Sequence, residues 1–289
     1  MTAPIKILVT GASGQLGSEF KRISGDYPLL LFTFLGRNEV SITDTESIEA
    51  LFINHRFDYC INCAAYTAVD KAESDKEEAY AVNAFAAAML AKICYKYKAG
   101  FVHFSTDYVF NGNGNKPYKE TDPVDPVSVY GASKLEGERL VMQGNPNAVI
   151  IRTSWVFSSF GKNFVKTMIR LMEEKEQIRV VNDQLGCPTY AGDLAIVVLT
   201  MICSSKGLVP GIYHYCNEGI TNWYLFASAI KNKINSPCEI LPIETKAYPT
   251  AAKRPAYSVL DSSKIKNTYA ITIPSWQHSL DACLNLLQS

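Results

Sequence analysis

A strand, a glycine-rich turn and a helix follow one another at the start of the chain, and no other stretch constrains the fold as strongly. Residues 5–10 form a short apolar, β-branched run typical of a buried strand, and residues 18–23 have a helical pattern. Gly11, Gly14 and Gly17 lie between them. Gly11 permits a tight turn, Gly14 lets the backbone approach a ligand, and Gly17 allows close helix packing. The arrangement points backbone N–H groups at an anion such as a dinucleotide pyrophosphate; a plain loop is the alternative for a bare glycine triplet.

The alternation of strand and helix continues to residue 153 and indicates the fold class. It predicts a Rossmann-type doubly wound parallel sheet, in which ligands bind beyond the carboxyl ends of the strands. The run over 29–35 is nearly all apolar, so we expect it to be buried on both faces. Residues 43–46 have a capping-box pattern that should open a helix over 47–55, and a long helix is expected over 74–98. The other expected strands cover residues 57–65, 101–105 and 149–153.

Beyond Trp155 the pattern becomes irregular. We expect two parts: a dinucleotide-binding domain over residues 1–155, and a smaller α/β substrate-binding lobe formed mainly by residues 156–289. Some segments of the second part should return to the first, so that the lobe is interleaved with it. The expected helices of this part cover 162–174, 193–203 and 222–234, and its expected strands cover 178–182, 211–216 and 239–243.

Composition and charge narrow the class of partner. The chain has 28 basic and 28 acidic side chains, so no overall field favours nucleic acid or an anionic membrane. The longest apolar run, over 194–201, is too short to span a bilayer, and residues 1–4 leave no room for a signal peptide, so we expect a cytoplasmic protein. Of the eight Cys residues, only Cys60 and Cys63 have ligand spacing, and they lie inside an apolar strand. All eight are expected to be reduced, and no metal site is expected.

Tyr130 and Lys134 are the candidate catalytic pair. Residues four apart on a helix lie on one face, and an ammonium near a phenol lowers the phenol's pKa from about 10 toward neutrality. Such a phenol suits a general acid that gives a proton to an oxygen becoming an alkoxide. Thr106, which follows the apolar run 101–104, offers that oxygen a second hydrogen bond. Chance alone supplies about one Tyr and Lys pair at this spacing, so a solvated helical pair is the alternative.

The ends of the expected strands place other candidate site residues near Tyr130 and Lys134, which favours a catalytic pair over a solvated one. Gly11, Ala64 and Ser105 stand at strand ends, which meet at one edge of a parallel sheet, so they are expected to converge there with Tyr130. The expected cofactor-binding residues are Gly11, Ser13, Gly14, Gln15, Leu16, Gly17, Arg37, Ala64, Ala65, Tyr66, Ser105, Tyr130 and Lys134.

Arg37 bears on the choice between NAD and NADP. In NAD sites an acid about 20 residues past the glycines holds the ribose 2′-hydroxyl. The segment 36–38 has Arg37 in that place, and a guanidinium there accepts a 2′-phosphate, which favours NADPH over NADH. In the competing interpretation Arg37 is a surface charge, Glu39 does the work of the acid, and NADH is possible.

Several longer stretches resemble one family of the extended short-chain dehydrogenase/reductases. The glycine turn, the Tyr130 and Lys134 pair and Thr106 are shared with that superfamily, and further stretches narrow the resemblance to the dTDP-4-dehydrorhamnose reductases. These stretches are 64–73, 105–110, 129–138, 152–157, 163–164, 182–189 and 254–255.

The resemblance implies a reaction and a role for each catalytic residue. The enzyme would reduce the C4 ketone of dTDP-4-dehydro-L-rhamnose with NAD(P)H, giving dTDP-L-rhamnose for cell-surface polysaccharide. Tyr130 would give its proton to the developing alkoxide, Lys134 would lower the pKa of Tyr130 and hold the nicotinamide ribose, and Thr106 would orient the ketone.

The substrate-binding residues implied by the resemblance come from several parts of the chain. Trp155 would pack against the sugar, with a core Trp as the alternative. Asn163 and Arg254 would contact the nucleotide diphosphate, for which Arg offers a bidentate fork. Asp107 and Asp70 are expected mainly to hold loops. The full expected set is Thr106, Asp107, Tyr130, Trp155, Asn163 and Arg254.

The sequence also departs from the family. Gly192 stands where some members have a Glu of a magnesium site that links a dimer, so magnesium is not supported and a monomer or a homodimer is expected. Ser41 and Ile42 stand where many members have an acid followed by Ile, which leaves the cofactor preference open.

Two other functions compete with this reductase. The non-catalytic regulatory subunit of methionine adenosyltransferase shares the fold and the Tyr and Lys pair, but it lacks Trp155 and has Ser at position 106. A reductase or epimerase for another nucleotide sugar would keep the same catalytic residues with a different pocket.

Overall fold

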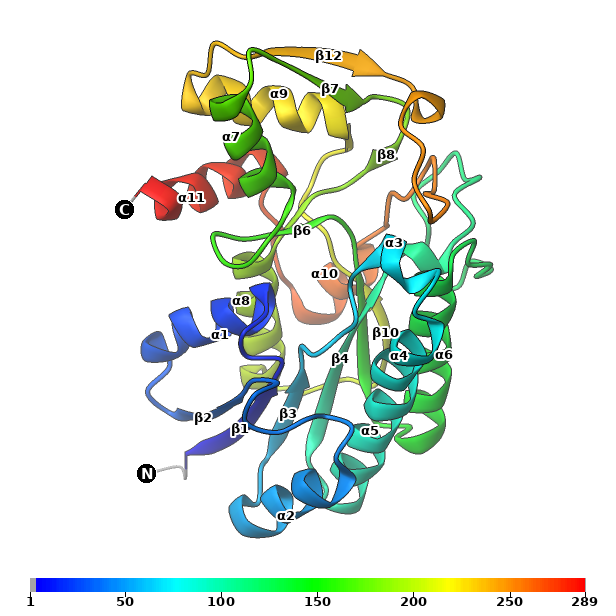
Figure 1. Ribbon diagram of the computed structural model, residues 1–289. Helices are drawn as coiled ribbons and strands as arrows, with labels where there is room; N and C mark the ends of the chain where they lie inside the picture. Colours follow the sequence, from blue (N-terminus) through cyan, green and yellow to red (C-terminus); the bar gives the residue numbers. More distant parts are fainter. Residues whose placement is uncertain (1–3, 289) are drawn as a thin grey trace.

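A six-stranded parallel sheet forms the centre of the computed structural model, which describes residues 4–288 (Figure 1). Its order, β10-β5-β4-β3-β1-β2, confirms the predicted doubly wound sheet. The strands are β1 (Ile5–Thr10), β2 (Leu30–Leu35), β3 (Tyr59–Asn62), β4 (Gly100–Thr106), β5 (Val149–Thr153) and β10 (Gly211–His214). β10 comes from beyond residue 155 yet pairs with β5. The expectation about a signal peptide concerns residues that lie mostly outside the described part.

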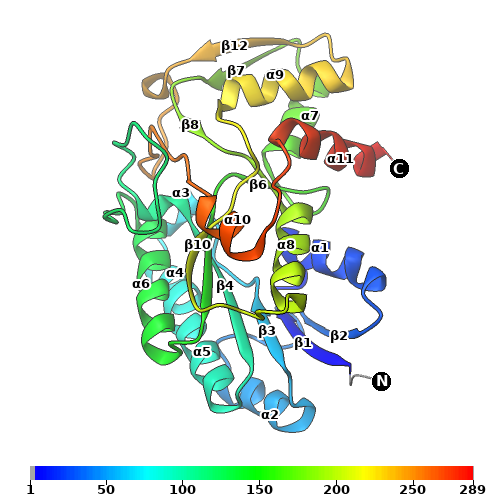
Figure 2. The same cartoon turned by 180° about the vertical axis from the view of Figure 1, so that it is seen from behind.

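Helices cover both faces of this sheet, and alternating strand residues explain why (Figures 1 and 2). In β1, Ile7 and Val9 join one buried cluster, with side chains of α1, α8 and α10, and Leu8 joins another, with α2, α5 and α6. The helices are α1 (Gln15–Ile23), α2 (Thr45–His55), α5 (Ala87–Lys96), α6 (Val129–Gly144), α8 (Ala191–Cys203) and α10 (Ser263–Tyr269). None of the helices in residues 4–288 has the length and apolar character needed to cross a bilayer.

The expectation that residues 29–35 are buried on both faces is wrong. β2 is the edge strand, and Leu29 and Leu31 are 61% and 48% exposed. Phe32 and Phe34 pack against the cluster beneath α1, whereas Leu29 and Leu31 alternate to the less covered side. An apolar run alone does not reveal whether a strand has neighbours on both sides.

The long helix expected over 74–98 is interrupted. It is divided into α4 (Lys76–Tyr80), a π-helical segment η2 (Ala81–Ala86) and α5. Asn83, in η2, is fully buried; its side chain accepts from Tyr66 N at 2.9 Å and donates to Ser133 Oγ at 3.0 Å. A Cβ at Gly137 of α6 would lie 2.1 Å from Asn83 O, so the two helices pack with their backbones close together. Asn83 therefore braces the loop after β3 against α6.

A smaller layer lies beyond the carboxyl ends of the sheet, at the top of Figure 1. Its parallel strands β7 (Gln177–Val181) and β12 (Glu239–Ile243) are flanked by α7 (Phe164–Glu174), α9 (Trp223–Ile234) and α11 (Trp276–Gln288). A separate apolar cluster that includes Phe157, Phe226 and Trp276 forms its core. The remaining short elements are α3 (Val69–Ala72), β6 (Val156–Phe157), β8 (Leu185–Gly186), β9 (Thr189–Tyr190), β11 (Thr221–Asn222), and the 3-10 turns η1 (Ser24–Asp26), η3 (Asp107–Val109) and η4 (Thr245–Ala247).

A buried ion pair fastens α6 to the sheet. Arg152 of β5 donates from Nε to Glu138 Oε1 at 2.9 Å and from Nη2 to Oε2 at 2.7 Å. Both side chains are only 3% exposed. Burial and the neighbouring Arg152 lower the pKa of His214 to about 3, so this imidazole adds no second positive charge. The helix that carries Tyr130 and Lys134 is thus held by a bidentate charged contact.

We predict that Glu138→Gln destabilises the protein by about 3–5 kcal/mol, because it leaves the Arg152 charge buried without its counter-ion. The matched control is Glu136→Gln on the same helix, whose pair with Arg139 is exposed and 3.7 Å long. Glu136→Gln should lower the free energy of unfolding by less than about 1 kcal/mol. Urea unfolding of both variants measures the difference, and equal small losses would contradict a structural role for the buried pair.

Candidate active site

The glycine turn has the geometry that its spacing predicted. Gly11 has φ +65°, and a Cβ there would lie 2.5 Å from Ala64 N. A Cβ at Gly17 would lie 2.4 Å from Gly11 O, which confirms the close packing of α1 on the turn. No side chain caps the N-terminus of α1. Its first N–H groups are therefore available to an anion.

A cavity of about 450 Å³ lies along this turn. It is bordered by the glycine turn, the loop after β2 and the loop after β3. The expected cofactor residues that line it are Gly11, Ser13, Gly14, Arg37, Ala64, Ala65 and Tyr66. Others lie outside its walls: Leu16 packs against the apolar core, and Gln15 accepts a hydrogen bond from Asn163 at 2.9 Å. Ser105 is buried, and its hydroxyl has no hydrogen-bond partner among residues 4–288.

Arg37 and Glu39 differ in how they relate to this cavity. The Arg37 side chain is 85% exposed at the wall of the cavity, and its ion pair with Glu78 is 3.3 Å long. The Glu39 carboxylate instead accepts a hydrogen bond from Gly36 N. Ser41 and Thr43 add hydroxyl groups to the same wall. A cation with two hydroxyls suits a phosphate better than an uncharged ribose hydroxyl.

The candidate catalytic residues lie where β4 ends and α6 begins. The Ser128 side chain caps α6 by accepting from Gly131 N at 3.2 Å, which fixes the turn that carries Tyr130. Lys134 is 2% exposed, and its Nζ donates to Phe104 O at 2.5 Å.

Thr106, the last residue of β4, is also buried. Its hydroxyl donates to Asp107 Oδ1 at 2.9 Å and accepts from Tyr108 N at 3.2 Å. The Tyr108 ring lies edge-on to the Tyr130 ring, with centroids 5.6 Å apart. The structure therefore brings Thr106, Tyr130 and Lys134 to one end of the sheet.

The pKa values of these groups are set mainly by burial. Burial raises the pKa of the Tyr130 phenol, and a hydrogen bond with Thr106 opposes this only in part. Burial lowers the pKa of Lys134 to about 8, although Glu138 acts in the opposite direction. Lys134 is not among the groups that shift the pKa of Tyr130 here, and its ammonium is bonded to Phe104 O, so the expected effect of Lys134 on Tyr130 stays a prediction. Tyr130 is a neutral phenol that holds its proton.

Asp107 combines a loop contact with a buried carboxyl group. Its backbone O accepts from Phe110 N at 3.1 Å, which closes the turn after β4. Burial raises the pKa of its carboxyl to about 6, and the hydroxyls of Ser258 and Thr106 oppose that shift. The carboxyl thus orients the Thr106 hydroxyl beside Tyr130.

The expected substrate-side residues lie at the border between the sheet and the smaller layer. Arg254 donates to Asp70 Oδ2 at 2.7 Å and to Tyr108 Oη at 3.2 Å, so one tyrosine ring separates it from Tyr130. Trp155 is half-buried and stacks on Trp223 with centroids 3.6 Å apart.

Asn163 has a different setting from the one expected. It caps α7 by accepting from Lys166 N at 3.1 Å, and it donates to Ser158 O and to Gln15 Oε1. Both polar ends of the side chain are thereby used, and they join α7 to the glycine turn. A contact between Asn163 and a diphosphate stays a prediction.

A second cavity, of about 640 Å³, begins at Arg254 and extends into the smaller layer. Its walls are largely apolar, with Gln177 and Arg179 among the polar side chains. Trp223 and Tyr248 line it, and neither was identified from the sequence. The only signal for Trp223 was rarity, since the chain has three Trp residues. Asp70 and Tyr108 lie within stretches that carried the family resemblance.

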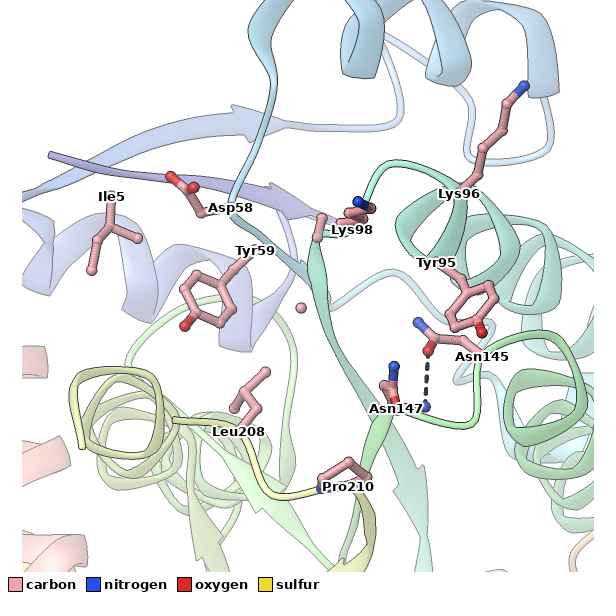
Figure 3. Close-up of a pocket in the computed structure, with 12 residues that line it drawn as sticks. Ile5, Asp58, Tyr59, Tyr95, Lys96, Lys98, Asn145, Asn147, Leu208 and Pro210 are labelled. Atoms are coloured by element: carbon pink, nitrogen blue, oxygen red, sulfur yellow. Dashed lines mark hydrogen bonds between the residues drawn. The ribbon is translucent and has the colours of Figure 1, made fainter. Parts of the chain in front are cut away.

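Another hollow opens at the opposite edge of the sheet (Figure 3). It has a volume of about 950 Å³ and lies where β1 and β3 begin, beside Ile5 and Tyr59. Asp58 and Asn147 are among its polar side chains. Ligands of doubly wound sheets bind at the carboxyl ends of the strands, so this hollow is on the wrong side for the cofactor.

Within residues 4–288 no three His, Cys, Asp or Glu side chains form a cluster able to hold a metal ion. At Gly192, a Cβ would lie 2.5 Å from the Tyr190 ring, so this position accommodates the packing of that tyrosine.

Comparison with known proteins confirms the family that the motifs indicated. A family profile described as RmlD substrate binding domain matches residues 5–289. The chain is 42% identical over 277 residues to the spore coat polysaccharide biosynthesis protein SpsK of Bacillus subtilis, covering 95% of each. It is 40% identical over 287 residues to a dTDP-4-dehydrorhamnose reductase of Aggregatibacter actinomycetemcomitans, covering 95% of this chain and 97% of the other.

A solved structure extends the similarity to three dimensions. The dTDP-4-dehydrorhamnose reductase of Bacillus anthracis in complex with NADP has 35% identity and a TM-score of 0.91, covering 97% of this chain and 99% of the other. With a profile that spans nearly the whole sequence and relatives at this identity, the chain belongs to the dTDP-4-dehydrorhamnose reductase family.

Proposed function

We propose that this chain catalyses the NADPH-dependent reduction of the C4 ketone of dTDP-4-dehydro-L-rhamnose to dTDP-L-rhamnose. The observation that carries the proposal is the position of Tyr130 beside Thr106 and Tyr108, at the end of the sheet that also holds the glycine turn. The names of the relatives supply the substrate and the reaction.

The residues around the glycine turn fit a dinucleotide with a 2′-phosphate. The uncapped α1 N-terminus and the glycine turn suit the pyrophosphate, and Arg37 suits the 2′-phosphate. The unpartnered Ser105 hydroxyl and Lys134 lie at the end where the nicotinamide ribose belongs. NADPH, when bound, supplies the hydride.

Tyr130 performs the proton transfer. Hydride transfer turns the ketone into an alkoxide, which takes the proton of the phenol. The raised pKa keeps this proton on Tyr130 until the alkoxide forms. Thr106 orients the carbonyl oxygen when its hydroxyl turns from Asp107 to the ketone, and the buried Lys134 ammonium adds positive charge at the same end of the sheet.

The nucleotide part of the substrate follows from the positions of Arg254 and the second cavity. The Tyr108 ring separates Arg254 from Tyr130, and the Arg254 guanidinium would bind the diphosphate. The cavity of about 640 Å³ that starts at Arg254 has room for the nucleoside.

The direct test is to follow NADPH absorbance with purified protein and a panel of dTDP-4-keto-6-deoxy sugars. Oxidation with dTDP-4-dehydro-L-rhamnose supports the proposal, and oxidation with a different sugar identifies another nucleotide-sugar reductase. No oxidation with any of them would favour the regulatory alternative.

Tyr130→Phe should lower kcat by roughly 10²–10⁴-fold, because it removes the proton donor and keeps the ring. Cofactor affinity, measured by fluorescence titration, should be unchanged. Tyr108→Phe is the matched control: it also removes one hydroxyl, bonded to Arg254, and should spare kcat. Substantial turnover by Tyr130→Phe would assign the proton to another group.

The pH dependence of kcat/KM should report Lys134. Its pKa is lowered to about 8, so the ammonium is charged below that pH and neutral above it. We expect kcat/KM to decline above about pH 8. In Lys134→Arg the guanidinium stays charged, so the decline in this pH range should disappear even though the overall rate falls. A decline that persists in that variant has another source.

Arg37→Ala should weaken NADPH binding by roughly 10–100-fold, the loss expected for one hydrogen bond to a charged group, and should leave NADH binding almost unchanged. Arg139→Ala, at another exposed arginine outside the cavity, serves as the control. Dissociation constants for both cofactors provide the measurement. Equal losses for NADPH and NADH would remove Arg37 from the 2′-phosphate site.

A further inference from the structure

We propose that Trp223 is a positioning residue that holds the indole of Trp155 in the orientation in which its exposed part contacts the sugar. The two rings are stacked, with centroids 3.6 Å apart and an interplanar angle of 11°. Trp155 remains half-buried, so part of its surface is free for a ligand. The inference rests on the proposed function in one respect, the assignment of Trp155 to the sugar.

Trp155 lies next to the catalytic residues by strand register. It follows β5 by two residues, and Thr153 at the end of β5 is paired with Thr106 at the end of β4. Trp223 is the first residue of α9 in the smaller layer. The stacked pair thus connects the catalytic edge of the sheet with that layer.

The backbone at Trp155 needs outside support. Its φ of +47° lies in the left-handed region, which is unfavourable for a bulky residue and persists only where the surroundings enforce it. Its own O accepts from Thr189 N at 3.3 Å. The stack on Trp223 adds a second restraint, at the far end of the side chain.

Gly186 leaves room over the indole ring. A Cβ at Gly186 would lie 2.6 Å from Cε2, 2.7 Å from Cζ2 and 2.9 Å from Nε1 of Trp155. Cε2 is recessed between the other two atoms yet is the nearest, so this Cβ would lie over the ring and not at its edge. The Gly186 backbone and the Trp223 ring therefore both restrain the plane of the indole.

Trp223 is itself anchored, as a positioning residue must be. Its Nε1 donates to Gln184 Oε1 at 3.1 Å, and Gln184 Nε2 donates to Thr245 Oγ1 at 3.0 Å. The Phe164 ring lies 4.6 Å from the Trp223 ring, centroid to centroid. These contacts come from three other segments of the chain, so the Trp223 ring is a rigid support.

The test uses the full-length protein with NADPH and dTDP-4-dehydro-L-rhamnose. Trp223→Leu should raise KM for the nucleotide sugar about tenfold, the order of one aromatic stacking contact, and should leave kcat and the cofactor Kd nearly unchanged. Because Trp223 also lines the cavity assigned to the nucleoside, Gly186→Ala, which reaches only the Trp155 indole, decides between positioning and direct contact. Trp223→Phe keeps a ring against Trp155 and should restore most of the affinity. Gly186→Ala, whose methyl group would press on the indole ring, should raise KM in the same way; a wild-type KM in this variant would leave only a direct contact of Trp223.

Circular dichroism gives a readout that a general loss of stability would not produce. Two stacked indoles couple, so the wild-type protein should show an exciton couplet that both Trp223 variants lose. Trp276→Phe is the matched control: Trp276 is buried and packs edge-on to Phe226, with centroids 5.5 Å apart. It should keep both the couplet and the wild-type KM.

Three further results would overturn the proposal: no couplet in the wild-type protein, a wild-type KM in Trp223→Leu, or an equal rise of KM in Trp276→Phe. Failure of the proposed function is distinguishable, because the wild-type protein would then oxidise no NADPH. In that case the variants are compared by their Kd for dTDP-L-rhamnose. About tenfold weaker binding by Trp223→Leu alone supports the positioning role, and equal binding refutes it.

Discussion

The parallel register of the central strands is the constraint on which the rest of the structure depends. Thr10, Asn62 and His103 lie side by side on three neighbouring strands. Buried hydrogen bonds of 2.7 Å, from Thr10 to Asn62, and 3.1 Å, between Asn62 and His103, join their side chains. Burial lowers the pKa of His103 well below its usual value, so the chain of bonds is uncharged. A slip of one residue would break these bonds and turn each side chain to the other face of the sheet. The bonds therefore fix the register of β1, β3 and β4, so that these strands end together.

Burial at those strand ends sets the pKa values of the candidate catalytic groups. The same loss of hydration raises the pKa of Tyr130, raises that of Asp107 to about 6 and lowers that of Lys134 to about 8. A phenol that keeps its proton is the state required of a donor to an alkoxide. Close helix packing produces this burial, since α6 approaches the backbone of η2 at Gly137 and is fastened to β5 by Arg152.

Sequence reasoning succeeded where local rules decide the structure and failed where neighbours decide it. Strand, glycine turn and helix order is local, and it predicted the sheet and the conformation of Gly11. The capping box over 43–46 located a helix start, but the helix begins at Thr45 with Asp44 as its cap, because the Asp44 carboxylate accepts from Ser47 N at 3.1 Å. The exposure of β2, the π-helical segment and the raised pKa of Tyr130 all depend on packing partners distant in sequence. The hydrophobic periodicity of a segment does not show which distant segments pack against it.

The contacts between the sheet and the smaller layer connect residues that are even further apart in sequence. Arg254 and Asp70 are 184 residues apart, and Asn163 and Gln15 are 148 residues apart. One contact borders the expected diphosphate position, and the other touches the glycine turn. Both contacts span the same border between the two parts of the fold, so together they fix the smaller layer over the carboxyl ends of the sheet.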